Sequence, residues 1–382
     1  MAALVLTIAV LLARRWGAIP RMNFEGVAAM EYTSGQAVGT WKVTANQVSI
    51  VADPSTANGG DNYLALANGT IATILPTIPW KTYSLSFAYR GPDAISYWSG
   101  DKTTNDPISG NNGALVAGAG YGPGHVGAAS FSISGQNVPD KVFLGDPGSL
   151  ELTNALAIEA WVYPKAHGNF SEIFERGDAR YCLDPYYLAV TAEGNLRLHV
   201  ETNDPTACGF NLDSTEVLPL NQWSHVAGTF DGRTGRLAVY INGSLAGQTN
   251  TTIKPFGALD PTQAPGVAIG NLEQDSANLW QGFYGYIDDV TVYGRFLSAS
   301  EVKAMWQEGS AGKRDINDPD VAQSLAKAEV LVNGARNTVF YGNNTNWQVE
   351  AITFTATGFS TPIAITGLEP GMLLDAVSKD SQ

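Results

Sequence analysis

The chain has 382 residues, enough for about two or three domains with separate hydrophobic cores. It is 44% hydrophobic and 15% charged and contains 41 glycines, which argues against a disordered chain or a coiled coil and favours antiparallel β-sandwiches. The net charge is −14 and no basic stripe occurs, so nucleic acid is a poor candidate as a partner. The acidic surplus serves solubility or supplies oxygen ligands for calcium, and both alternatives stay open.

The N-terminal segment is apolar from Ala2 to Leu12 and continues with Arg14 and Arg15. This run is too short for a transmembrane helix, so we interpret residues 1–21 as a signal-peptide-like segment. A secreted or cell-surface protein is therefore expected. In an exported chain the two cysteines, Cys182 and Cys208, predict one disulfide, and two buried thiols are the alternative.

Alternating apolar and polar residues predict strands along most of the chain. In chain order the clearest lie at 83–89, 156–163, 187–191, 196–200, 237–246 and 285–293. Asn242-Gly243 predicts a two-residue hairpin turn, because both turn positions need a positive φ. A capping box of Ser298 and Glu301 predicts a short helix, and Asp318-Pro319 is the candidate start of a second helix running to about Lys327. Break-forming residues near 93 and 315 divide the chain into segments.

The central segment contains a series of short motifs in a fixed order. They include Ile158-Glu-Ala-Trp161-Val, Trp223-Ser-His225-Val-Ala-Gly, Tyr240-Ile-Asn-Gly243 and Gly285-Tyr-Ile-Asp288-Asp. This series resembles the laminin-G-like, concanavalin A-like jelly-roll family, to which the pentraxins are related. The resemblance implies a jelly roll over residues 94–312.

The flanking segments resemble a second family. Asn23-Phe-Glu25, Gly39-Thr-Trp41 and Leu368-Glu-Pro-Gly371 to Asp375-Ala-Val are similar to motifs of galactose-binding-like carbohydrate modules. The resemblance implies that residues 22–92 and 328–379 are two halves of one sandwich, interrupted by the jelly roll at a loop. Three tandem units are the alternative. The predicted fold class is all-β, with two antiparallel β-sandwiches and very little helix.

Sequence motifs for catalysis are missing. There is no Gly-x-Ser-x-Gly elbow, His-Glu-x-x-His, P-loop or Cys-x-x-Cys. A glycoside hydrolase would need two carboxylates on one strand face. Glu172 and Glu175 are the nearest pair, but residues three apart on a regular strand face opposite sides. A non-enzyme is expected, with His225 in a framework hydrogen bond and His199 on a solvated face.

One acidic loop is similar to the calcium loop of pentraxins. The resemblance implies that Glu273 and Asp275 bind Ca²⁺ through carboxylates, Gln274 through its main-chain carbonyl, and Gln281 and Asp184 through side chains. Carboxylates gathered at one point repel each other unless a cation lies between them. An ordinary polar loop is the alternative. The galactose-binding-like resemblance implies a second, structural calcium site at Glu25 and Asp375.

The expected function is that of an extracellular, non-catalytic carbohydrate-binding or adhesion module, with calcium as its cofactor and glycans or glycoproteins as partners. The sandwich resemblances and an aromatic content of 10% favour this hypothesis, since aromatic rings stack on sugar faces. The alternatives are a structural surface or matrix subunit with no small ligand, and a glycoside hydrolase with an unrecognised site.

Overall fold

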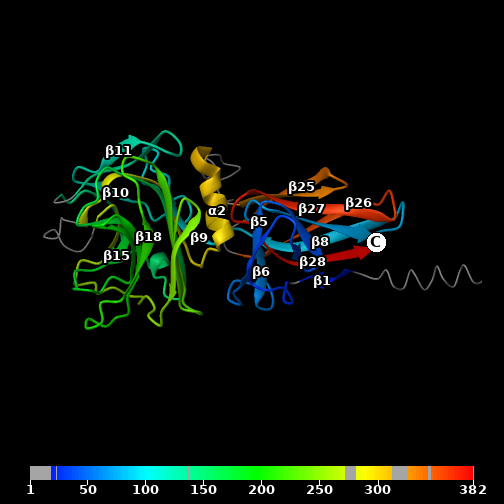
Figure 1. The fold of residues 1–382 in the computed structure, drawn as a ribbon, viewed down its shortest axis with the longest axis horizontal. Helices are drawn as coiled ribbons and strands as arrows, with labels where there is room; N and C mark the ends of the chain where they lie inside the picture. The colour runs from blue at the N-terminus through cyan, green and yellow to red at the C-terminus, as the bar shows by residue number, and fades with distance from the viewer. Residues whose placement is uncertain are drawn as a thin grey trace, which may run out of the picture. The chain divides into compact units, whose positions relative to one another are not determined.

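The computed structural model describes residues 19–22, 24–135, 138–271, 281–311, 326–342 and 346–381. They form two units: unit 1 contains the described residues before 93 and after 323, and unit 2 those from 93 to 311. Strands dominate both, and α2 (Ala299–Glu308) is the one α-helix of the described residues (Figure 1). The all-β prediction is therefore confirmed. No described helix combines the length and the apolar character needed to cross a membrane.

Unit 1 consists of two antiparallel sheets. Sheet 1A has the order β2-β5-β6-β28-β8-β26, with β1 also paired to β28, and sheet 1B has the order β25-β24-β27-β7-β4-β3. The strands of the first segment are β1 Ile19–Met22, β2 Glu31–Thr33, β3 Ala37–Val38, β4 Trp41–Ala45, β5 Gln47–Ala52, β6 Asn62–Ala65, β7 Thr70–Pro76 and β8 Thr82–Arg90. Those of the last segment are β24 Ala326–Val332, β25 Ala335–Gly342, β26 Gln348–Thr355, β27 Ser360–Glu369 and β28 Leu373–Ser381.

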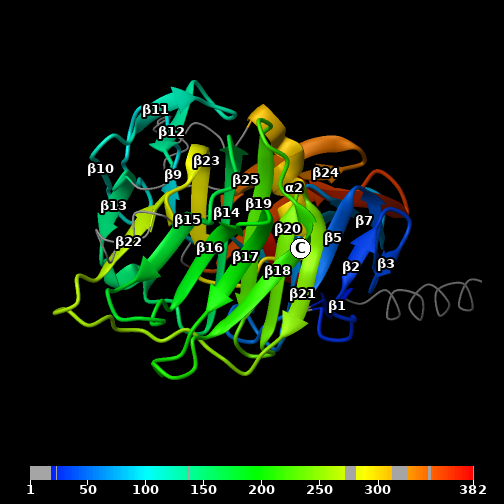
Figure 2. The same cartoon turned by 60° about the vertical axis from the view of Figure 1, so that its left-hand side comes forward.

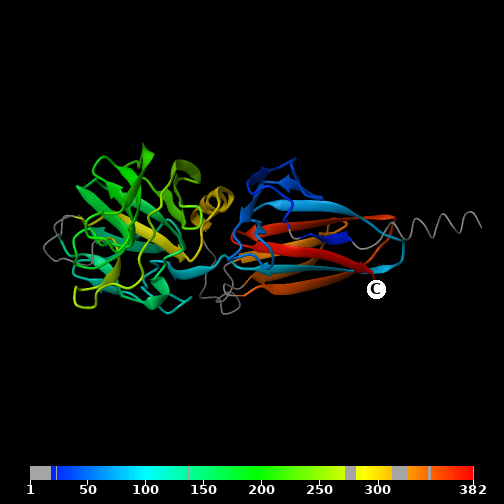
Figure 3. The same cartoon turned by 90° about the horizontal axis from the view of Figure 1, so that it is seen from below.

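The two segments of unit 1 share one core. β8 pairs with β26 and β28, and β7 pairs with β27, so blue and cyan strands lie beside orange and red ones in the same unit (Figure 3). Alternate residues of these strands point inward, as Leu85 and Phe87 of β8 do, and meet Ile352 and Ile365 in one apolar cluster. Each segment therefore supplies strands that the other needs to bury its apolar face.

Unit 2 also consists of two antiparallel sheets around one core (Figure 2). Sheet 2A has the order β11-β12-β23-β14-β19-β20-β21, with β9 also paired to β23, and sheet 2B has the order β10-β13-β22-β15-β16-β17-β18. The strands of sheet 2A are β9 Ala94–Trp98, β11 Gly120–Pro123, β12 Ala129–Ser134, β14 Ala155–Pro164, β19 Ser224–Asp231, β20 Arg236–Ile241, β21 Ser244–Asn250 and β23 Tyr284–Tyr293. Those of sheet 2B are β10 Ala114–Val116, β13 Lys141–Gly145, β15 Phe170–Gly177, β16 Tyr186–Thr191, β17 Asn195–Val200, β18 Phe210–Val217 and β22 Gly266–Ile269.

Two local predictions are confirmed in unit 2. Asn242 and Gly243 have φ values of 49° and 69° and form the tight turn between β20 and β21. Ser298 and Glu301 form the capping box at the start of α2, where each side chain meets the backbone of the other residue. The hairpin turn and the capping box each depend only on residues close together in the chain, so the sequence pattern identifies both.

Unit 1 should fold without unit 2. A Cβ placed on Gly342 would lie 2.7 Å from the backbone nitrogen of Gly91, and Gly342 pairs with Ala326. The two chain ends that flank unit 2 therefore lie close together. We expect a protein in which a short Gly/Ser linker replaces residues 94–320 to give a β-type circular dichroism spectrum and a cooperative melt. The first segment alone, residues 22–92, should be unfolded, and a cooperative melt of that isolated segment would contradict this account.

Candidate functional site

An aromatic pocket lies on the outer face of sheet 2A. Alternation along β14 and β23 directs Val162 and Ile287 into the core, so their neighbours Tyr163 and Tyr286 point outward. The pocket has a volume of about 510 Å³. It is lined by Pro123, Tyr163, Lys165, Asn221, Trp223, Tyr284 and Tyr286.

The aromatic rings of the pocket contact one another. The ring centroids of Tyr163 lie 5.5 Å from Trp223 and 5.6 Å from Tyr286, and those of Trp223 and Tyr286 lie 6.3 Å apart. These separations are typical of packed aromatic pairs, which hold each other in place. The pocket wall therefore consists of apolar ring surfaces in a preformed arrangement.

Lys165 adds a positive charge to the pocket. Its Nζ lies 4.0 Å from the ring centroid of Tyr286 and 5.6 Å from that of Tyr284, within cation–π range. No carboxylate of the described residues lines the pocket. The pocket thus offers apolar ring faces, the amide of Asn221 and one ammonium group.

A loop held by two aspartates supports the pocket. Oδ2 of Asp288 accepts hydrogen bonds from the backbone N–H groups of His125 and Val126, at 2.8 and 3.0 Å. Oδ1 of Asp101 accepts those of Ala128 and Ala129, at 2.7 and 2.8 Å. The His125 ring, carried by this loop, lies 5.6 Å from the Trp223 ring. Asp288 and Asp101 therefore hold the loop whose His125 ring lies beside Trp223 of the pocket wall.

The pKa of Asp288 is raised to about 8, chiefly because the carboxyl group is buried. Its two backbone hydrogen bonds oppose the rise, and nearby Asp289 and Asp101 add to it. Since the folded pKa lies above the ordinary value near 3.8, ionisation of Asp288 costs stability. The stabilisation of the fold that comes from the protonated Asp288 carboxyl is fully present below about pH 4 and is lost as the pH rises through 8.

We therefore expect Asp288→Asn to weaken the pH dependence of unfolding. The introduced amide stays neutral and keeps an oxygen acceptor, so the free energy of unfolding should fall less between pH 4 and 8 than in the unaltered protein, by at most roughly 1.4 kcal/mol per pH unit. Urea unfolding at several pH values, in the presence of a chelator, measures this slope. Asp288→Ala, which removes the acceptor, should be destabilised at every pH. Equal slopes for Asp288→Asn and the unaltered protein would refute the assignment.

The second candidate region is the outer face of sheet 2B, and here one sequence prediction is wrong. Glu172 and Glu175 face the same side, since Glu172 lies opposite Ala189 and Glu175 opposite Tyr187. A β-bulge causes this, because Ile173 and Phe174 both point into the core. The two carboxylates are enclosed, with exposed fractions of 2% and 0%.

Asp184 lies close to other acidic groups on this face. Burial raises its pKa to about 8, and Asp178 and Glu201 add to the rise. Burial and the nearby Asp184 also raise the pKa of Glu172. A carboxylate cluster of this kind is stabilised by a bound cation or by protonation.

The predicted calcium ligands Glu273, Gln274 and Asp275 lie outside the described residues. Oε1 of Gln281 is buried and accepts no hydrogen bond from the described part of the chain. Within that part, no group of three or more His, Cys, Asp or Glu side chains could hold a metal ion. The pentraxin-like site therefore stays a prediction, consistent with the donor types of Asp184 and Gln281.

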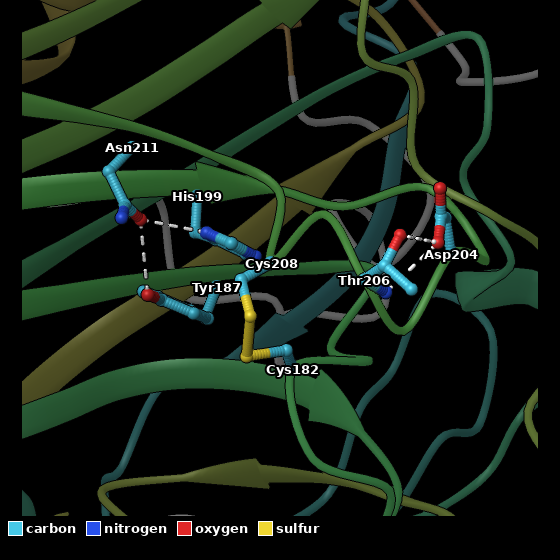
Figure 4. The surroundings of a disulfide bond; sticks show 7 residues. All are labelled: Cys182, Tyr187, His199, Asp204, Thr206, Cys208 and Asn211. Carbon is cyan, nitrogen blue, oxygen red and sulfur yellow. Dashed lines mark hydrogen bonds between the residues drawn. A yellow bond between two sulfur atoms is a disulfide. The ribbon is translucent and has the colours of Figure 1, made fainter.

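Two other predictions concern the same sheet. Cys182 and Cys208 form the predicted disulfide (Figure 4). The prediction of a solvated His199 is wrong, because its ring is 5% exposed and stacks on Tyr187 at 4.4 Å between centroids. Its Nδ1 lies 2.8 Å from Oδ1 of Asn211 (Figure 4). Burial lowers the pKa of His199 to about 4, so the ring is neutral at pH 7.

His225 has the framework role predicted for it. Its Nε2 lies 2.7 Å from Oε2 of Glu159, and the hydroxyl of Tyr293 donates to Oε1 of the same carboxylate at 3.0 Å. All three side chains are buried. The network links β14, β19 and β23 across sheet 2A.

Unit 1 brings Glu25 and Asp375 together, as the second calcium prediction requires. Oε1 of Glu25 accepts the backbone N–H groups of Asp61 and Asn62, each at 2.9 Å. Burial raises the pKa of Asp375 to about 6, Glu25 adds to the rise, and backbone hydrogen bonds oppose it. Two neighbouring carboxylates beside a loop backbone are donors that suit Ca²⁺.

Comparison with known proteins gives a family for the central segment. Residues 136–303 match the family model described as the concanavalin A-like lectin/glucanases superfamily. No curated protein matches the sequence significantly.

Several solved structures are similar to the chain. Domain 4 of AbnA, an extracellular GH43 arabinanase from Geobacillus stearothermophilus solved with arabinotriose, is 20% identical over 56% of this chain and 98% of its own, with a TM-score of 0.44. The CBM40 of Ruminococcus gnavus IT-sialidase, bound to α2,3-sialyllactose, is 17% identical over 46% and 93%, with a TM-score of 0.38. The SAP-like pentraxin of Limulus polyphemus is 15% identical over 73% and 98%, with a TM-score of 0.33. At TM-scores below 0.5, no argument about the ligand rests on these likenesses. The family match and the two packed sheets nevertheless agree that residues 136–303 belong to a concanavalin A-like β-sandwich.

Proposed function

We propose that the protein is an extracellular, non-catalytic carbohydrate-binding or adhesion module that binds glycans in the aromatic pocket of unit 2. The observation that carries this proposal is the preformed wall of Tyr163, Trp223 and Tyr286 around a volume of about 510 Å³. The match of residues 136–303 to a superfamily that includes lectins supports it.

The chemistry of the pocket suits a sugar ring. A pyranose has an apolar face of C–H groups that packs on an aromatic ring, and hydroxyl groups at its edge that need hydrogen-bonding partners. Trp223 and the tyrosines offer the first kind of contact, and Asn221 and Lys165 offer the second. Because Lys165 is cationic and the described lining residues include no carboxylate, acidic sugars should bind more tightly than neutral ones.

We expect Trp223→Ala to weaken glycan binding about tenfold or more, since a buried aromatic contact is worth about 1.4 kcal/mol or more. A glycan array, followed by calorimetry on the best ligand, measures the loss. Tyr181→Ala is the matched control, because Tyr181 is 85% exposed and does not line the pocket.

Lys165→Met should lower affinity for carboxylated sugars and leave affinity for neutral sugars nearly unchanged. If Trp223→Ala and Tyr181→Ala bind glycans as the unaltered protein does, the pocket is not the binding site.

A glycoside hydrolase is the second candidate, favoured by the shared face of Glu172 and Glu175. The raised pKa of Glu172 suits a general acid. Their near-complete burial argues against it, because a general acid must reach the substrate. Release of reducing sugar from polysaccharides, abolished by Glu172→Gln, would favour the hydrolase.

We further propose that calcium is bound at Asp184, Glu273, the Gln274 carbonyl, Asp275 and Gln281 in unit 2, and at Glu25 and Asp375 in unit 1. Calcium that binds only the folded state raises the melting temperature as its concentration rises. Asp275→Ala should remove the part of this shift that belongs to unit 2, and Asp375→Asn the part that belongs to unit 1. The readout is calorimetry with calcium or with chelator. An unaltered protein with the same melting temperature in both would contradict both sites.

A further inference from the structure

One end of unit 1 presents an exposed apolar surface built from two loops. The first loop connects β7 to β8 and the second connects β26 to β27. The backbone N–H of Thr77 donates to the carbonyl of Phe359 at 3.0 Å, and that of Trp80 donates to the carbonyl of Ala356 at 2.7 Å. The loops are therefore joined, and they hold Trp80 81% exposed, Phe359 70% exposed and Ile78 44% exposed. We call these three side chains the apolar tip.

The backbone of Trp80 is strained. Its φ is +65°, in the left-handed region where an L-residue with a large side chain costs about 1–2 kcal/mol and glycine costs nothing. An exposed tryptophan does not recover this cost through burial in the protein. Strain of this kind at an exposed position indicates a role for the side chain outside the folded unit.

Cationic groups lie behind the apolar tip. Lys81 follows Trp80, whereas Lys379 is buried, and burial, with a smaller effect of the Lys81 charge, lowers the pKa of Lys379. Nζ of Lys379 donates to the carbonyl of Pro76 at 2.6 Å. The chain also enters unit 1 at this end, because Ile19 pairs with Lys379. In the sequence, β1 follows the apolar run Ala2–Leu12 and the pair Arg14 and Arg15.

We propose that the apolar tip of unit 1 inserts into the interfacial layer of a lipid bilayer. Tryptophan and phenylalanine prefer this layer, and the side chain of Lys81, which follows Trp80 in the loop, is long enough to reach lipid phosphates beside the tip. A sugar platform fits less well, because Ile78, Pro79 and Trp80 offer only the indole N–H as a side-chain hydrogen-bonding group. The proposal is independent of glycan binding in unit 2.

The test compares variants of the full chain in cosedimentation with phosphatidylcholine vesicles, with and without one-quarter phosphatidylserine. Trp80→Gly and Phe359→Ser should each lower partitioning about tenfold, which corresponds to about 1.4 kcal/mol. Trp80→Phe should restore most of it. Brominated lipid should quench more of the tryptophan fluorescence in the unaltered protein than in Trp80→Gly.

Two controls distinguish a loss of the apolar tip from a change in surface hydrophobicity elsewhere or a loss of stability. Val349→Ser changes a 73% exposed apolar residue of unit 1 outside the tip and should leave partitioning unchanged. Trp80→Gly should melt no lower than the unaltered protein, within a few degrees, because glycine relieves the strain at a similar entropic cost. Unchanged vesicle binding in both tip variants would overturn the proposal. Loss of glycan binding in Trp80→Gly, with vesicle binding intact, would overturn it in favour of a sugar platform.

Discussion

Unit 1 depends on the pairing of β8 with two strands from the other end of the chain. β8 lies between β28 and β26, and the hydroxyls of Thr82 and Thr355 meet across a sequence separation of 273 residues. Residues 82–90 therefore lack both of their neighbouring strands until residues 326–381 fold against them. Because closing so long a loop costs entropy that grows only slowly with length, an intervening folded unit is tolerated. Such non-local pairing is also expected to make unit 1 the slower part to fold.

Unit 2 uses one set of strands for both its core and its surface chemistry. On β14 and β23, the inward residues fill the jelly-roll core and the outward ones build the aromatic pocket. On sheet 2B, the outward residues are Glu172, Glu175, Arg197 and His199 instead, and Asp184 lies close to Glu172 from the loop before β16. One sheet thus presents ring faces and a lysine, and the other presents enclosed carboxylates.

Buried carboxylates recur in both units. Burial raises the pKa of Asp184 and Asp288 to about 8 and that of Asp375 to about 6. Each costs folding free energy when ionised, unless hydrogen bonds or a cation compensate. Asp288 has two backbone donors, and it positions the loop that carries His125. For Asp184 and Asp375, calcium is the proposed compensation.

Features that depend on neighbouring residues could be predicted from the sequence alone. Alternation predicted the strands and the all-β class, Asn242-Gly243 the hairpin, Ser298 and Glu301 the helix start, and an ordered series of motifs the jelly roll. The pair Cys182 and Cys208 was predicted because no other cysteine competes.

Contacts between side chains from distant strands could be read from the folded structure but not from the sequence. A bulge at Ile173 and Phe174 shifted the alternation, so Glu175 faces the side of Glu172. Packing against Tyr187 buried His199. The aromatic pocket joins residues from four separate parts of the chain, and the apolar tip joins Trp80 to Phe359. Period-two patterns describe one regular strand, whereas these contacts arise from register, bulges and loops between strands that are distant in sequence.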